Sequence, residues 1–389
     1  MPDLAAFIRT HEDRWIDLRR HFHAHPELSN LEVATTAVLS EQMAAIGAKP
    51  LACPTPTGAA FVIDGGRPGK TVLLRADIDA LPVEETRDLP FRSAVPGVMH
   101  ACGHDAHTAG LIGTAAALAD AADDLPGRYV LVFQPAEEAL DGAKKMLEGG
   151  LLDGLEVDAA LAWHAASIAP TGLVGLRNHT LMSRSQHVEI HAHGRGGHGA
   201  LATSGGNVLL AVAELSQRLA ASVEGLTYEG TDCVCSAGIL RAGTAANVIP
   251  NSATLAGTLR TFTPDQFTLA RERLETLVAE VAEAQGVEIE LVLGEHADAV
   301  VNDPGVADVV RKVARRVLAN ESVLDVPPVA PSDDMSEFLK RIPGCYFFVG
   351  AGLADGSSGG HHEASFAIDD ACIAIGASVI AEAAVALAT

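Results

Sequence analysis

A cysteine and a histidine two residues apart form the strongest candidate for chemistry in this sequence. The segment MHACGHDAH, residues 99–107, places Cys102 and His104 before an apolar stretch with helical spacing. A thiolate and an imidazole are both good ligands for zinc and related ions, and both can face one metal from a loop. Two alternatives are a Cys–His nucleophile pair, although nothing nearby resembles its orienting third member, and a helix start without chemistry.

Carboxylates and a further histidine follow other apolar runs. Glu137 and Glu138 come after YVLVFQPA, Asp79 stands in TVLLRADIDALP, and His164 closes the run AALAWHA. Adjacent glutamates point in different directions, so one can bind a metal while the other reaches the water that the metal activates. Taken singly, the glutamates could be a solvated surface pair and His164 a hydrogen-bonded core residue.

Two more histidines, His361 and His362, stand in the glycine-rich loop GSSGGHHEASFAIDD, which could equally be a flexible surface loop. Together the segments offer Cys, His, Glu, His and His as ligands, with one carboxylate left free, all near the ends of expected strands. In an α/β domain, ligands gather at the carboxyl ends of the strands. This combination, rather than any single match, predicts a metal-dependent active site.

The pattern of apolar runs predicts an α/β catalytic domain with an inserted α+β domain. Strand-like runs alternate with helical stretches in the first half, which indicates a mixed, largely parallel sheet with flanking helices. From about residue 183 two strand pairs and two helices, 207–221 and 264–285, indicate an antiparallel sheet. We expect the catalytic domain to comprise 1–182 and 295–389, and the insertion 183–294.

Charge and composition restrict the class of partner. The formal net charge is −23, so nucleic acids and anionic membranes are excluded as main partners. The first residues, MPDLAAFIRTHEDRW, lack the basic start and apolar core of a secretory signal, and we find no uninterrupted apolar run of about 18 residues. We therefore expect a cytoplasmic protein whose six cysteines remain thiols.

Nearly the whole chain resembles the metal-dependent aminoacylase and carboxypeptidase family, in the branch of hippurate hydrolases, N-acyl-amino-acid amidohydrolases and indole-acetyl-amino-acid hydrolases. The matching segments occur in family order: RRHFHAHPELS, LLRADIDALPVEE, MHACGHDAHTAGLIG, VFQPAEEALDGAKKM, GRGGHGA, AGTAANVIPN, GTLRTF and HHEASFAIDD. The resemblance implies hydrolysis of an amide bond in a small N-acyl amino acid or related compound. It also implies two divalent metal ions, zinc or manganese before cobalt or nickel.

The resemblance assigns roles residue by residue. The implied metal ligands are Cys102, His104, Glu138, His164 and His362. His362 is preferred to His361 because it stands four residues before Phe366, where the family histidine precedes an aromatic residue. Glu137 matches the general base, which takes the proton of the attacking water and returns it to the leaving nitrogen. Asp79 matches a carboxylate that orients the metal ligands.

The inserted domain supplies further implied residues. His198, in GRGGHGA, matches a donor to the oxyanion that often comes from the partner subunit, and its alternative is a turn histidine. Asn247 and Arg260 match groups that can bind a substrate carboxylate, although both could be structural. The resemblance further implies a homodimer or higher homo-oligomer through the insertion. The alternating His21, His23 and His25 match a segment that does not bind metal.

Departures from the family pattern lie in or beside the insertion. The chain reads GALATSGGNVLL where many members carry Pro-His and Asp-Pro pairs, and LRNHTLMSRSQHVEI lacks the usual Ala/Ser–Asp pattern. These differences spare the hydrolytic centre and affect the expected substrate. Alternatives are a deacylase or desuccinylase of a diaminopimelate-type intermediate, a small dipeptidase and a non-catalytic ligand-binding protein. The presence of Glu137 beside Glu138 argues against the last, because binding alone needs no base.

Overall fold

The computed structural model describes residues 2–201 and 206–389. The chain divides into two compact units. Unit 1 comprises Met1–His179, Val301–Val326 and Asp334–Thr389, and unit 2 comprises Thr180–Val300 and Pro327–Asp333. Each unit has its own hydrophobic core. Residues 202–205, within the segment that departs from the family pattern, lie outside the described residues.

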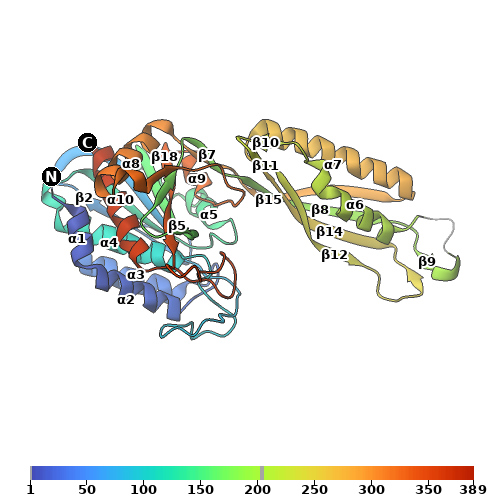
Figure 1. Ribbon diagram of the computed structural model, residues 1–389, viewed down its shortest axis with the longest axis horizontal. Coiled ribbons are helices and arrows are strands. Elements are labelled where there is room, and N and C mark those ends of the chain that lie inside the picture. Colours follow the sequence, from blue (N-terminus) through green and yellow to red (C-terminus); the bar gives the residue numbers. More distant parts are fainter. Residues whose placement is uncertain (1, 202–205) are drawn as a thin grey trace. The chain divides into compact units, whose positions relative to one another are not determined.

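An eight-stranded mixed sheet forms the centre of unit 1 (Figure 1). Its strands, in spatial order, are β1 (Lys49–Leu51), β2 (Ala59–Asp64), β4 (Pro126–Gln134), β3 (Arg67–Asp77), β5 (Ala159–Pro170), β18 (Gly344–Gly352), β6 (Val174–Leu176) and β17 (Val323–Asp325). The central strands β4, β3, β5 and β18 are mutually parallel, whereas β1, β2 and β4 pair antiparallel. This arrangement confirms the predicted α/β class with a largely parallel sheet.

Helices cover the sheet of unit 1. They are α1 (Leu4–Thr10), α2 (Glu12–Ala24), α3 (Val33–Ile46), α4 (His104–Asp120), α5 (Gly142–Glu148), α8 (Pro304–Val317), α9 (Ser336–Leu339) and α10 (Ala371–Ala388). Every residue of α4 from His104 to Leu118 is buried. Its many alanines and glycines let it lie close to the sheet, on the face that carries Leu74, Leu161 and Phe347. The opposite face is buried as well, so the strands are continuously apolar, as parallel sheets require.

The helix α10 is the one described helix that is long and apolar enough, by length and composition, to cross a membrane. Glu382 interrupts its apolar run, so the sequence alone does not indicate a membrane span here. Within the structure 72% of the apolar window is buried. It packs against α4 and α8 in the core of unit 1, which is the environment of a core helix.

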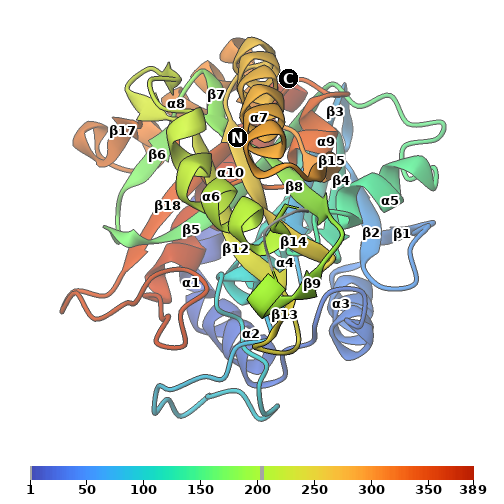
Figure 2. The same cartoon turned by 90° about the vertical axis from the view of Figure 1, so that its right-hand side faces the viewer.

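Unit 2 is a four-stranded antiparallel sheet with two helices (Figure 2). The strands, in spatial order, are β12 (Val234–Ala242), β14 (Ser252–Thr261), β8 (Arg184–His193) and β15 (Glu288–Ala297), and the helices are α6 (Val208–Ser222) and α7 (Pro264–Gln285). Thr263 caps α7 by accepting the Gln266 N–H, and Gly286 ends the helix with a φ of 62°. Short strand pairs are β9 (Gly197–His198) with β13 (Val248–Ile249), and β10 (Thr227–Tyr228) with β11 (Thr231–Asp232).

The chain passes between the units four times, because a short segment from the C-terminal part returns to unit 2. It leaves unit 1 within β7 (His179–Met182) and returns within β16 (Val300–Asn302). Segment 327–333 then accepts hydrogen bonds inside unit 2, from the Ser183 N–H to Val329, from Thr231 to Pro328 and from Arg260 to Ala330. The sequence pattern predicts this segment in the catalytic domain, with all of 295–389, whereas in the structure it belongs to unit 2.

Candidate metal centre

A tight turn brings Cys102 and His104 against the sheet. Gly103 precedes α4 with a φ of 96°, a left-handed conformation that glycine adopts without strain. A Cβ atom at Gly103 would lie 3.3 Å from the Cβ of Ala165, on β5. The turn therefore sets both potential ligands beside the part of β5 that carries His164.

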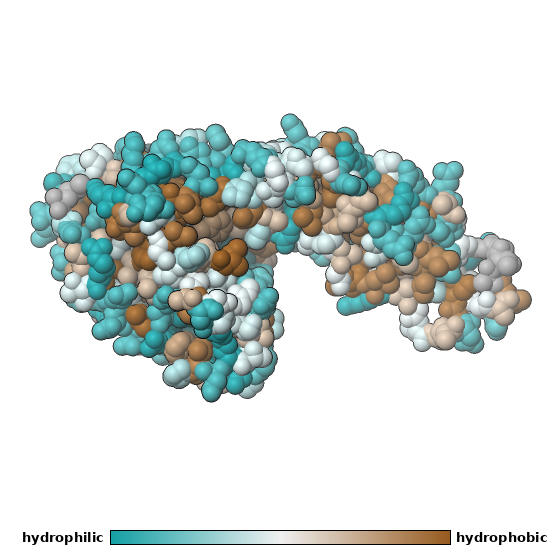
Figure 3. Space-filling model, viewed as in Figure 1, coloured by the Kyte–Doolittle hydropathy of each residue, from teal (hydrophilic) through white to brown (hydrophobic). Residues whose placement is uncertain are grey.

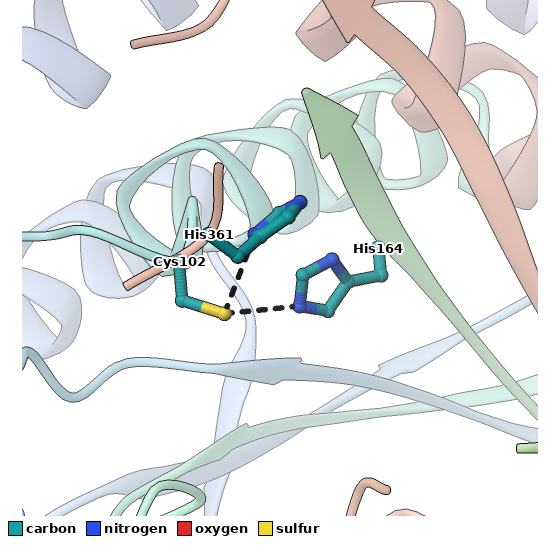
Figure 4. Close-up of side chains that lie close together, drawn as sticks. All are labelled: Cys102, His164 and His361. Atoms are coloured by element: carbon teal, nitrogen blue, oxygen red, sulfur yellow. Dashed lines mark hydrogen bonds between the residues drawn. The ribbon is translucent and has the colours of Figure 1, made fainter. Parts of the chain in front are cut away.

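The thiol of Cys102 lies between two histidines from distant parts of the chain (Figure 4). Its Sγ atom is 3.4 Å from Nε2 of His164 and 3.7 Å from Nδ1 of His361. The three ligand atoms lie within 4.8 Å of one another, and Cys102 is buried. The expected strand ending at His164 continues to Pro170, because β18 pairs with β5 beyond the last β3 partner, Ala162.

Asp79 connects His104 to the glutamate pair. Its carboxylate accepts the backbone N–H groups of Glu137 at 3.1 Å and Glu138 at 3.0 Å, and the hydroxyl of Ser29 at 2.7 Å. Its backbone carbonyl accepts Nδ1–H of His104 at 2.9 Å. Burial raises the pKa of Asp79, but the hydrogen bonds and the charge of His104 outweigh it and lower that pKa below its usual range. One buried carboxylate thus fixes the backbone of both glutamates.

The remaining ligand atoms fit a divalent cation. Nε2 of His104 is buried and, among the described residues, has no hydrogen-bond partner, and the buried Oε1 of Glu138 lies 3.9 Å from it. Buried polar atoms are normally paired, so such atoms call for an explanation. The Nδ1–H of His164 donates to the carbonyl of Ala165 at 2.8 Å, which leaves its Nε2 lone pair free for a metal. Sulfur, nitrogen and oxygen donors together suit zinc, manganese, cobalt or nickel.

Both histidines of the glycine-rich loop reach this group of side chains. His362, with a φ of 65°, places Nε2 3.3 Å from Oε1 of Glu138. Hydrogen bonds with Cys102 and Glu138 raise the pKa of His362 to about 10. His361, which is not among the predicted ligands, contacts Cys102 and accepts the backbone N–H of Ser167 at 3.3 Å. The spacing to Phe366 favours His362, but it does not predict that His361 also contacts Cys102.

The predicted residues of the insertion lie in unit 2. His198 is exposed on β9 and pairs with Val248 of β13, which brings Asn247 close: its carbonyl accepts the Gly199 N–H at 2.8 Å. Arg260 instead donates to the carbonyl of Ala330 at 3.0 Å, and burial lowers the pKa of its guanidinium. The structure therefore places His198 and Asn247 close together. At least one N–H group of Arg260 is already used in a hydrogen bond to the backbone of unit 2.

A buried ionic network lies next to His104 in the sequence. Oδ2 of Asp105 lies 3.0 Å from Nε of Arg19 and 2.8 Å from Nδ1 of His23. The other ring nitrogen of His23, Nε2, lies 3.3 Å from Oε1 of Glu85. His23 is thus occupied by carboxylates. This network was not predicted from the sequence, although Arg19, His23 and Asp105 all belong to the segments that match the family.

Comparison with known proteins identifies the family. The model of peptidase family M20/M25/M40 matches residues 73–386. The chain belongs to this family. As an M20 family member it is a hydrolase, and the resemblance noted from its motifs is confirmed.

Relatives of this M20 hydrolase match over nearly their full length. Thermostable carboxypeptidase 2 of Saccharolobus solfataricus is 35% identical over 95% of this chain and 94% of its own. N-acetyl-L-cysteine deacetylase of Bacillus subtilis is 34% identical, over 94% of this chain and 86% of its own. The crystal structure of the Bacillus subtilis YXEP protein, titled a dinuclear metal binding peptidase, is 30% identical, with a TM-score of 0.84 and coverage of 98% and 99%.

Proposed function

We propose that this protein is a metal-dependent amidohydrolase that cleaves the amide bond of small N-acyl amino acids. The observation that carries the proposal is the group of ligand atoms from Cys102, His104 and Glu138, with His164 beside Cys102. In this group, Nε2 of His104 is buried and has no hydrogen-bond partner among the described residues. His362 completes the proposed ligand set. The deacetylase and carboxypeptidase relatives both act on bonds of this chemical class by name, and the dinuclear neighbour supports two divalent ions.

When bound, the two ions would supply Lewis acidity, which polarises the amide carbonyl and lowers the pKa of water. Glu137 is our candidate for the general base: its side chain is nearly buried, and Asp79 holds its backbone N–H. In this mechanism the Glu137 carboxylate accepts the proton of the attacking water and then donates it to the leaving nitrogen. We propose that His198 donates to the oxyanion, and that Asn247 and Arg260 bind the substrate carboxylate.

The mechanism is tested by replacing the base alone. Glu137→Gln keeps the size of the side chain but cannot accept the proton, so kcat should fall roughly 10²- to 10⁴-fold, with the bound metal unchanged. Glu156→Gln, an exposed glutamate elsewhere on unit 1, is the matched control and should keep wild-type kcat. An active Glu137→Gln variant would refute the assignment.

Substrate and metal are tested together on the metal-stripped protein. The protein would be resupplied with zinc, manganese, cobalt or nickel and assayed on a panel of N-acyl amino acids, N-succinyl diaminopimelate analogues and dipeptides. We expect turnover of N-acyl amino acids with zinc or manganese. Turnover of dipeptides alone would favour the peptidase alternative, and failure on every amide would favour a ligand-binding protein.

We further propose that the protein is a cytoplasmic homodimer formed through unit 2. The strand β12 is at the edge of its sheet, and Val234, Ile239 and Leu240 along it are 37–46% exposed. Figure 3 shows apolar surface in this region, near α6 and β12. Such an edge can pair with a second chain. Light scattering should give a dimer for the wild type and a monomer for Ile239→Lys; a monomeric wild type would refute the proposal.

A further inference from the structure

His107, one turn after His104 on α4, is buried beside the candidate metal centre and contacts two elements at once. Its Nδ1 atom is 2.6 Å from Oδ1 of Asp77, at the end of β3, and its Nε2 atom accepts the backbone N–H of Ala165 at 2.9 Å. A backbone N–H can only donate, so Nε2 must carry the lone pair. The proton of neutral His107 therefore resides on Nδ1 and is donated to Asp77.

This hydrogen-bonding pattern shows that His107 is not available as a ligand. Ligand atoms of His104, His107 and His164 lie within 4.8 Å of one another, so the three could be taken for a metal site. The only lone pair of the His107 ring is, however, already used by Ala165. Any effect of His107 on the metal centre must therefore be exerted through a neighbouring residue.

The neighbour is His164. The N–H of Ala165 is held by His107, while the carbonyl of Ala165 accepts Nδ1–H of His164 at 2.8 Å. The rings of His107 and His164 also meet edge to face, with centroids 4.5 Å apart. These contacts leave the His164 ring with Nε2 directed at Sγ of Cys102.

Asp77 is held in turn by buried groups. Nη1 of Arg75 donates to its second carboxylate oxygen at 2.7 Å, and Nη2 of Arg75 donates to Asp334 at 2.9 Å. The hydroxyl of Thr108, next to His107, donates to the Asp77 carbonyl at 3.0 Å. Arg75, Asp77 and His107 are all nearly inaccessible to solvent. Buried hydrogen bonds thus connect the end of β3 to β5 through His107.

We propose that Asp77 and His107 form a positioning pair that aims His164 at the metal centre. Asp77 sets the tautomer of His107, His107 fixes the peptide beside His164, and His164 presents its Nε2 atom to the cation. The inference rests on the proposed function, in which His164 is a ligand. Partners of this kind typically change metal affinity 10- to 100-fold.

Titration of the metal-free protein with Co²⁺ tests the pair without an activity assay. Calorimetry gives the affinities, and visible absorption reports the geometry of the Co²⁺ ion and its bond to the Cys102 thiolate. For His107→Phe, which keeps a ring but no lone pair, we expect the affinity for one of two ions to fall roughly 10- to 100-fold, with an altered spectrum. His107→Gln, whose side-chain oxygen can accept the Ala165 N–H, should restore much of the affinity.

Two further variants separate positioning from general damage. Thr114→Val removes a buried hydrogen bond on the same helix, to the Ala377 carbonyl, and should bind Co²⁺ like the wild type. Asp77→Asn removes the carboxylate that fixes the tautomer, so it should weaken binding as His107→Phe does, and it decides the matter if the Phe variant does not fold.

The outcomes distinguish the two proposals. Unchanged Co²⁺ affinity and spectrum in the folded His107 and Asp77 variants, with normal binding by the wild type, would overturn the positioning pair alone. A wild-type protein that binds no Co²⁺ would overturn the proposed metal centre and the pair with it.

Discussion

Three glycines on two helices face tryptophan rings, and replacing each by alanine should give a graded loss of stability. A Cβ at Gly376, on α10, would lie 2.5 Å from Cε2 of Trp163, and one at Gly110, on α4, 2.8 Å from Cζ2 of the same ring. A Cβ at Gly113 would lie 3.1 Å from the ring of Trp15. Relative to an ordinary contact of 3.4 Å, the ring must move by about 0.9 Å (3.4 less 2.5), 0.6 Å (3.4 less 2.8) and 0.3 Å (3.4 less 3.1) respectively.

Two terms set the size of each effect. Alanine stabilises a helix by about 1 kcal/mol relative to glycine, whereas overpacking a close-packed core costs about 1–3 kcal/mol. Trp163 is buried and cannot turn aside, so Gly376→Ala should lower the free energy of unfolding by about 2 kcal/mol. Gly110→Ala should lower it by about 1 kcal/mol, and Gly113→Ala should leave it within about 1 kcal/mol of the wild type.

The measurement is urea unfolding followed by tryptophan fluorescence. The chain has two tryptophans, and both lie in unit 1, so the signal reports the unfolding of the unit that contains all three glycines. Because Trp163 directly precedes His164, Gly376→Ala should also weaken Co²⁺ binding, while Gly113→Ala should not. A Gly376→Ala variant as stable as the wild type, or less destabilised than Gly113→Ala, would refute the packing argument.

Three further outcomes are expected for other parts of unit 1. Arg19→Met leaves the buried carboxylate of Asp105 without its guanidinium partner, so the free energy of unfolding in urea should fall by about 3–5 kcal/mol. Burial lowers the pKa of His23, but hydrogen bonds with Asp105 and Glu85 outweigh it and raise that pKa. The free energy of unfolding of the wild type should therefore exceed that of His23→Gln by the largest amount below about pH 6.5, and the excess should shrink as the pH rises through the raised pKa. A difference that grows with pH would contradict this. Native protein should expose one thiol to a thiol reagent, that of the half-buried Cys53, because burial raises the pKa of the other five cysteines; rapid reaction of several thiols would count against the described core.

Features encoded locally could be predicted from the sequence. Continuous apolar runs indicated the buried parallel strands, and the helix expected at 264–285 has those bounds in the structure. Cys102 and His104 were identified because two good ligands occur two residues apart. Their assigned role as metal ligands stays a prediction, as does that of His362.

Features that depend on tertiary contacts could not be predicted. The contact of His107 with the N–H of Ala165 joins residues 58 positions apart, and it depends on how α4 lies on β5. The separate surroundings of His361 and His362 depend on a left-handed backbone conformation at His362. The return of segment 327–333 to unit 2 carries no sequence signal, because its hydrogen bonds come from its own backbone carbonyls.

The order in which a ribosome delivers the chain follows from that returning segment. Residues 180–300 leave the exit tunnel before segment 327–333, so Ser183, Thr231 and Arg260 meet their acceptor carbonyls only after residues 328–331 have been synthesised. The sheet of unit 1 is completed later still, because β18 lies between β5 and β6 within it. Neither unit can be completed on the nascent chain until most of the protein exists. We therefore expect ribosome-bound intermediates to expose apolar strands, and chaperones that shield them to raise the yield of folded protein.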